Sequence, residues 1–209
     1  MDGVLVSSLG SVERSWTKWA QLRGVDPAYA RSIAHGRRSI ETVARLRPDL
    51  DPEAENRIVE EMEVEDTEGV VALPGVPKLL AALPGNRWTV VTSATERLAR
   101  VRLKAGGISA PERFVAAELV THGKPHPQPF LAGAALLGFA PEDCVVIEDA
   151  ASGVRAGRAA GCTVVATAFS QPVESLDAAN YVIEDLAGVE VETLPGDEGL
   201  ALRLTPLAG

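Results

Sequence analysis

The chain has 209 residues, of which 46% are hydrophobic and 4% aromatic, enough for one full core with or without a small inserted lobe. Its formal net charge of −9 argues against nucleic acid or an anionic membrane surface as the main partner. No apolar run approaches the roughly 20 residues of a membrane span and no basic-then-apolar leader is visible, so we expect a cytoplasmic protein with no membrane partner.

The chain opens on Asp2 and Gly3, followed by the apolar residues 4–6. An Asp-Gly step of this kind is typical of a loop into which a buried strand delivers a carboxylate. No strand-forming segment stands ahead of Asp2 in the printed sequence.

The next segment, from about residue 11 to residue 71, reads as helices with short breaks and contains no convincing strand. We expect an all-helical cap domain at residues 12–71, inserted into a core formed by residues 1–11 and 72–209. Trp16 and Trp19 fall nearly on one helix face, and we interpret them as core of this lobe rather than as a sugar platform.

The rest of the chain alternates short apolar runs with helical segments. The runs at residues 88–92, 144–148 and 162–167 are apolar without alternation, which is the mark of parallel strands covered on both faces. Helical patterns lie between and after them at residues 96–105, 127–137 and 151–160, and the tail reads as an edge hairpin. The sequence therefore predicts a doubly wound α/β fold, a Rossmann-like parallel sheet.

Ligands of such folds bind beyond the carboxyl ends of the strands. The residues expected there are two adjacent acids, a further acid, a lysine and a hydroxyl. Acids that hold a divalent cation, beside a lysine and a hydroxyl that hold an anion, suit phosphoryl transfer. These residues are Asp2, Ser93, Lys124, Glu148 and Asp149.

Each of these residues also has a simpler interpretation. Ser93 and Glu96 match a capping box, so Ser93 could cap its helix. Lys124 could be a surface lysine, and the pair Glu148 and Asp149 could cap the helix beginning near Ala151. Paired acids at the end of a buried strand are costly without a cation or donor, which favours a metal site.

The order and spacing of four motifs resemble the haloacid dehalogenase-like hydrolases over nearly the whole chain. The motifs are "MDGVLV", Ser93 at the end of a strand, Lys124 in "GKPHP", and the Glu-Asp pair of "EDAASG". The helical insert resembles the subgroup that contains beta-phosphoglucomutase, and several segments are similar to bacterial hexose- and hexitol-phosphate phosphatases. Ser7 and Gln128 stand where the family usually has aspartate.

The resemblance implies Mg²⁺-dependent hydrolysis of a small phosphorylated sugar or polyol. It implies that Asp2 is the general acid and base, that Lys124, Ser93 and the amide of Ala94 neutralise the phosphoryl oxygens, and that Asp149, Glu148 and the Asp2 carbonyl hold the metal. Substrate selection falls to the cap turn of His35, Arg37 and Arg38, which could instead be a solvated basic turn.

The resemblance also implies a nucleophile that the printed sequence does not show. The family's nucleophile is the first aspartate of Asp-x-Asp, and Asp2 matches the second, so the nucleophile and its central strand would stand immediately before Met1.

Two alternative functions stay open: a hexose-phosphate mutase and a non-catalytic binder of phosphorylated ligands. A dinucleotide-binding domain fails for lack of G-x-G-x-x-G. We expect a monomer or weak homo-oligomer.

Overall fold

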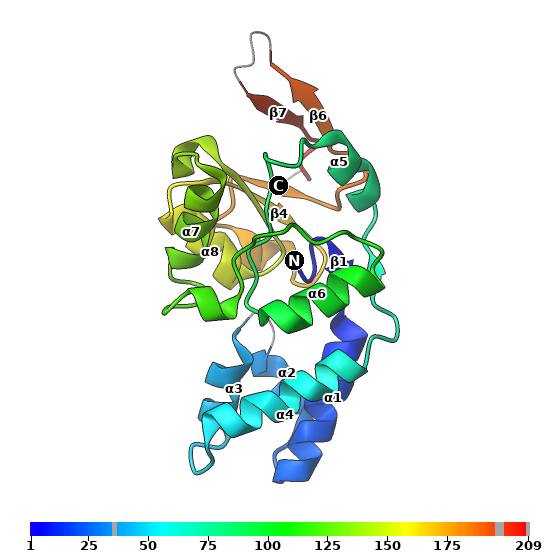
Figure 1. The fold of residues 1–209 in the computed structure, drawn as a ribbon, viewed down its shortest axis with the longest axis vertical. Coiled ribbons are helices and arrows are strands. Elements are labelled where there is room, and N and C mark those ends of the chain that lie inside the picture. The colour runs from blue at the N-terminus through cyan, green and yellow to red at the C-terminus, as the bar shows by residue number, and fades with distance from the viewer. Residues whose placement is uncertain (35–36, 195–198, 208–209) are drawn as a thin grey trace.

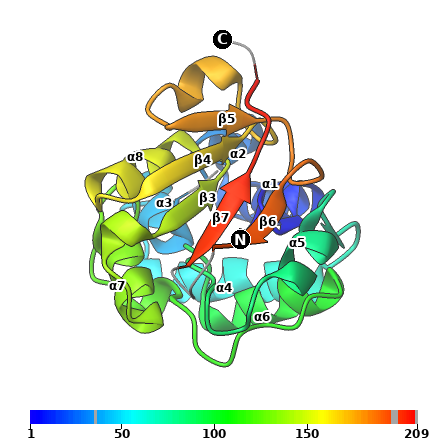
Figure 2. The ribbon, with the colours of Figure 1, turned by 90° about the horizontal axis from the view of Figure 1, so that it is seen from above.

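The computed structural model describes residues 1–34, 37–194 and 199–207. Figure 1 shows three parts along the long axis: a helical lobe, an α/β core in the middle and a small hairpin at the opposite end. The N-terminus lies near the centre of the molecule in both Figure 1 and Figure 2.

The helical lobe follows almost at once from the opening loop. Its helices are α1 (Leu9–Arg23), α2 (Pro27–Ala34), α3 (Ser39–Leu46) and α4 (Pro52–Glu65). Trp16 and Trp19 are buried in its core with their rings edge to face and 5.5 Å apart, which confirms that they are core residues.

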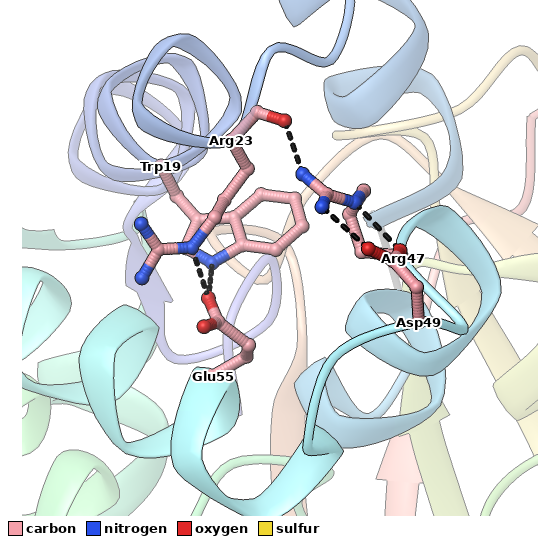
Figure 3. A network of polar contacts seen from close by, with 5 residues as sticks. All are labelled: Trp19, Arg23, Arg47, Asp49 and Glu55. Atoms are coloured by element: carbon pink, nitrogen blue, oxygen red, sulfur yellow. Dashed lines mark hydrogen bonds and ion pairs between the residues drawn. The ribbon is translucent and has the colours of Figure 1, made fainter.

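A buried carboxylate ties the first and last helices of the lobe together. Glu55 of α4 accepts hydrogen bonds from Nε1 of Trp19 at 2.8 Å and from Nε of Arg23 at 2.7 Å (Figure 3). Beside it, Arg47 donates to the carbonyl of Arg23 and pairs with Asp49. The lobe is therefore fixed internally by charge-assisted hydrogen bonds as well as by apolar packing.

One short ladder joins the lobe to the core. Strand β1 (Val6–Ser7) pairs antiparallel with β2 (Val71–Ala72), so the chain enters and leaves the lobe at neighbouring positions. Val6 is fully buried, and it packs into the main core together with Val70 and Leu73.

The core has a parallel sheet in the order β3 (Val145–Glu148), β4 (Thr163–Thr167) and β5 (Tyr181–Ile183), seen side by side in Figure 2. An α/β fold with a parallel sheet and an N-terminal helical region is thereby confirmed. The helices and turns around it are α5 (Val76–Ala82), α6 (Glu96–Ala105), α7 (Gln128–Leu137), α8 (Ala151–Ala159) and the 3-10 turns Ala117–Leu119, Pro141–Asp143 and Val173–Leu176.

The run at residues 88–92 is only partly a strand. Val91 forms one parallel bridge with Val115, and the amides of Thr92 and Val115 donate to the carbonyls of Val115 and Val90 at 2.9 Å. The segment is extended and paired along one edge.

A cavity of about 580 Å³, which we call the sheet groove, separates residues 88–91 from residues 144–147. Strand β3 pairs with β4 along its other edge, and residues 90–92 pair with Val115 along theirs. Within the described residues, the two edges that face each other across the groove have no strand between them. Side chains of α5 and α7 line this groove, and so does Met1.

The tail forms the expected hairpin, with β6 (Glu190–Thr193) antiparallel to β7 (Leu200–Arg203). Leu200 and Leu202 line the sheet groove. Among the helices of the described ranges, none is both long enough and apolar enough to cross a membrane.

Candidate active site

A cavity of about 110 Å³ lies between the carboxyl-terminal rim of the core and the helical lobe. The structure brings the core residues of the predicted site together there, although they come from four separate segments. The lobe adds Arg37 and Trp16. The predicted site residues that line this cavity are Asp2, Ser93, Ala94, Lys124, Glu148, Asp149 and Arg37.

Glu148 and Lys124 form a buried ion pair at the floor of the cavity. Glu148 is 4% exposed, and its second carboxylate oxygen accepts the amide of Asp149 at 3.1 Å. Burial would raise the pKa of Glu148, but the charge of Lys124 and these hydrogen bonds hold it below its usual value. Glu148 is therefore a carboxylate that fixes Lys124 in the site.

Both acids at the end of β3 lie against glycines. A Cβ atom at Gly3 would lie 1.8 Å from Oδ2 of Asp149, and a Cβ atom at Gly153 would lie 2.1 Å from the carboxylate carbon of Glu148. Gly3 also has a φ of +68°, a conformation that other residues adopt at a cost. The opening loop thus passes directly over the Asp149 carboxylate because residue 3 has no side chain.

The donor set at this point suits a magnesium ion. Magnesium takes oxygen ligands and is commonly held by one or two carboxylates, with the rest from substrate phosphate and water. Asp149 is 5% exposed and lies at the cavity, and Glu148 is beside it. Within the described residues, no group of three or more His, Cys, Asp or Glu side chains is placed to hold a metal. The fit therefore rests on these two acids together with oxygens of other kinds.

Asp2 is held by two donors that the sequence did not reveal. Its Oδ1 accepts a hydrogen bond from the Ser8 hydroxyl at 2.6 Å and forms an ion pair with Nη1 of Arg102 at 3.2 Å. Burial would raise the pKa of Asp2, but the charges of Arg102 and of the Met1 amino group, together with the Ser8 hydrogen bond, bring it below the ordinary value. The carboxylate form is therefore favoured before an anionic substrate arrives.

Ser93 does not cap the helix that follows it, so the capping-box reading is wrong. The N-cap of α6 is Thr95, whose hydroxyl accepts the amide of Leu98 at 3.3 Å and donates to Glu60 of the lobe at 2.6 Å. Ser93 instead lines the cavity. The amide of Ala94 donates to the Thr92 hydroxyl at 3.1 Å in this structure.

The two arginines of the basic turn in the lobe lie in different surroundings. Arg37 is exposed and lines the cavity, whereas Arg38 packs on the core loop after residue 120. Nη1 of Arg38 donates to the carbonyl of Thr121 at 3.4 Å, and a Cβ atom at Gly123 would lie 2.7 Å from Cδ of Arg38. His35, the third residue expected here, lies outside the described residues.

Sequence reasoning missed Arg102, Glu63 and Ser8. Arg102 is 4% exposed on α6 and pairs with Asp2 and, at 3.2 Å, with Glu63 of α4. A basic residue in the last turn of a helix has an ordinary explanation in the helix dipole, so nothing in the local pattern marks Arg102 as buried. Glu63 belongs to an acidic run that reads as a solvated face, yet it is 5% exposed.

Comparisons with known proteins identify the family of the chain. A family model described as haloacid dehalogenase-like hydrolase matches residues 1–161. Hexitol phosphatase A of Escherichia coli (strain K12) is 40% identical over 203 residues, which cover 95% of this chain and 94% of that protein. Glycerol-1-phosphate phosphohydrolase 2 of Saccharomyces cerevisiae is 33% identical over 84% of this chain and 75% of its own length.

Solved structures show the same fold. CbbY from Rhodobacter sphaeroides, as a mutant in complex with xylulose-(1,5)bisphosphate, matches with a TM-score of 0.79 and 24% identity over 90% of this chain and 92% of that one. Beta-phosphoglucomutase from Clostridium difficile matches with a TM-score of 0.75 and 24% identity, covering 89% and 88% of the two chains. By its motifs, its fold and these relatives, the chain belongs to the haloacid dehalogenase-like hydrolase family.

Proposed function

We propose that this protein is a magnesium-dependent phosphatase of small sugar or polyol phosphates. The observation that carries the proposal is the convergence, in one cavity under the helical lobe, of the buried Lys124–Glu148 pair with Asp149 and Asp2. The relatives named as hexitol and glycerol-1-phosphate phosphatases support the substrate class.

The residues of the cavity divide the work of phosphoryl transfer. Lys124, Ser93 and the Ala94 amide bind the phosphoryl oxygens and offset the charge that develops on them. Asp149, with Glu148 beside it, would hold Mg²⁺, which supplies Lewis-acid charge neutralisation at the phosphate when bound. Asp2 protonates the departing alkoxide and later takes a proton from the attacking water. The incoming phosphate anion raises the pKa of Asp2, because like charges nearby favour the neutral acid.

The sheet groove supports a place for the nucleophile. A parallel strand within it would pair with residues 88–91 on one side and with β3 on the other, and its carboxyl end would meet Met1 beside the cavity. We place the attacking carboxylate at the end of such a strand, immediately ahead of Met1. That carboxylate forms the aspartyl-phosphate, which water then hydrolyses.

The lobe selects the leaving group in this proposal. Arg37 lines the cavity from the lobe, and a guanidinium suits an oxygen-rich ligand. His35 and Arg38 remain candidates for the same role; the contact of Arg38 with Thr121 places it at the junction of lobe and core. We expect the lobe to exclude water while the substrate is bound.

The function is tested by phosphate release from a hexitol phosphate, glycerol phosphate and a hexose phosphate, with magnesium or with a chelator. The protein is assayed with an apolar strand ending in Asp ahead of Met1, and a matched form ends this strand in Asn. We expect magnesium-dependent release by the Asp form only, without any bisphosphate activator. No release from any monoester by the Asp form would disprove the function, and turnover by residues 1–209 alone would disprove the placement of the nucleophile.

A further inference from the structure

Arg102 joins the lobe to the proposed acid-base residue through two buried ion pairs. Its guanidinium reaches Oδ1 of Asp2 with Nη1 and Oε1 of Glu63 with Nη2, each at 3.2 Å. Arg102 belongs to α6 of the core, whereas Glu63 belongs to α4 of the lobe. All three residues line the cavity, so one guanidinium connects the lobe, the core and the reacting side chain.

We propose that Arg102 is a positioning residue, through which the helical lobe sets the orientation of the Asp2 carboxylate. The inference rests on the proposed function, because it assigns a task to Asp2 in that reaction. Arg102 does not touch the phosphate in this scheme. It holds one oxygen of Asp2 at a fixed place, shared with the Ser8 hydroxyl, and leaves the other oxygen to the proton transfer.

A role in holding the lobe to the core would not require a buried arginine. The same two helices are already joined by the exposed pair of Arg97 and Glu61, and Thr95 donates to Glu60 at the next contact along α4. Exposed pairs of this kind hold two surfaces together without the desolvation cost of a buried one. Arg102 is 4% exposed, and neither its Nε nor its Nη2 has a hydrogen-bond partner within the described residues, so its contact with Glu63 is an ion pair without a hydrogen bond.

The geometry links the position of the lobe to the acid-base step. Because Glu63 moves with α4, a change in the angle between lobe and core displaces its carboxylate from Nη2 of Arg102. The guanidinium then keeps its ion pair with Glu63 or with Asp2, but not both in the present geometry. Asp2 is then fully oriented only when the lobe lies as it does here. A loss of orientation slows the proton transfer without weakening the donors of the phosphate site, since Lys124 is fixed separately by Glu148.

Leaving-group dependence tests the proposal. Alkyl phosphates such as a hexitol phosphate need a proton on the departing oxygen, whereas p-nitrophenyl phosphate releases a stabilised phenolate and does not. In the form that carries the nucleophile, Arg102→Met should lower the first-turnover rate of leaving-group release from the hexitol phosphate by roughly 10²-fold, at the lower end of the range for acid-base catalysis, and change that rate for p-nitrophenyl phosphate several-fold less. Arg102→Lys should recover part of the loss, and Glu63→Gln should show the same pattern more weakly.

Arg97→Met is the matched control, since it breaks an ion pair between the same two helices away from the cavity, and both activities should be kept. Thermal unfolding of every variant separates misfolding from misorientation; if Arg102→Met does not fold, Glu63→Gln carries the test. Equal losses in the first-turnover rate on the two substrates, or no loss on either, would overturn the role of Arg102 while leaving the phosphatase in place. A parent protein inactive on both substrates would instead overturn the function itself.

Discussion

The α-carbon of Gly3 faces the carboxylate of Asp149 so closely that an added Cβ would lie 1.8 Å from Oδ2. Gly3→Ala should therefore displace Asp149 or the opening loop and abolish magnesium-dependent turnover. The matched control is Gly24→Ala, because Gly24 has nearly the same φ, +65° against +68°, and no atom within 4 Å of its Cβ position.

Gly24→Ala introduces only backbone strain, about 1–2 kcal/mol of unfolding free energy, and should keep its activity. Calorimetry and phosphate release measured on both variants separate strain from collision. Full activity in Gly3→Ala would show that the loop does not constrain Asp149.

Asp2 and Asp149 should fail in different ways when each is changed to asparagine. Asp2→Asn should still bind magnesium but lose roughly 10²- to 10⁴-fold in kcat on alkyl phosphates, the scale of a general acid-base group. Asp149→Asn should weaken magnesium binding, because one carboxylate oxygen of the cation site becomes an amide. Titration of activity with magnesium measures both effects, and equal magnesium affinity in the two variants would contradict this division.

The stability of the lobe should depend on pH through Glu55. The hydrogen bond from Arg23, together with that from Trp19, holds the pKa of Glu55 below its ordinary value. A carboxyl whose pKa is lowered by folding stabilises the protein above its unfolded pKa, about 4.3, and this stabilisation is lost as the pH falls through the folded value. Glu55→Gln should cost about 1–3 kcal/mol of unfolding free energy near pH 7.

Denaturant unfolding at several pH values measures this effect. The difference between parent and Glu55→Gln should shrink as the pH falls below about 4. Asp49→Asn is the control, since the Asp49–Arg47 pair in Figure 3 is largely exposed and should contribute little. A difference that stays constant down to about pH 2, well below the ordinary pKa of a glutamate, would show that packing of Glu55, rather than its charge, stabilises the lobe.

Arg37 and Arg38 should differ in their effect on specificity. Arg37→Ala removes a lining side chain of the cavity and should change the ranking of hexitol, hexose and glycerol phosphates, with little effect on p-nitrophenyl phosphate. Arg38→Ala removes a contact with the loop of Thr121 and Gly123 and should lower all activities together. The reverse result, a changed ranking in Arg38→Ala alone, would return the selection of substrate to Arg38.

Much of the core could be predicted because its signals are local. Continuous apolar runs mark β3 and β4, and the helix expected at residues 96–105 has the observed bounds of α6. The capping box was wrong for a physical reason: both Ser93 and Thr95 carry a hydroxyl near the start of α6, and only the hydrogen bond from the Leu98 amide in the folded chain shows that Thr95 is the cap. Local pattern cannot choose between two hydroxyls two residues apart.

The charged residues of the site show where prediction from sequence ends. Glu148 and Asp149 end an apolar run typical of a parallel strand, and Lys124 and the Asp2–Gly3 step are expected at the same edge of the sheet, so their convergence could be foreseen. Arg102 and Glu63 lie in the last turns of two helices that the fold brings together across a lobe boundary. Their burial depends on the angle between the helices, which neither helix encodes by itself.

The ladder of Val6–Ser7 with Val71–Ala72 makes the lobe a transferable module. The chain segments that enter and leave the lobe pair with each other over two residues. A different set of helices can therefore be inserted between Ser7 and Val71 without disturbing the parallel sheet. The catalytic core then stays unchanged, and new substrate specificities can arise by exchange of whole lobes as well as by point substitution. Such an exchange must bring a partner for Arg102 with it, which sets a compatibility rule for chimaeras built at this junction.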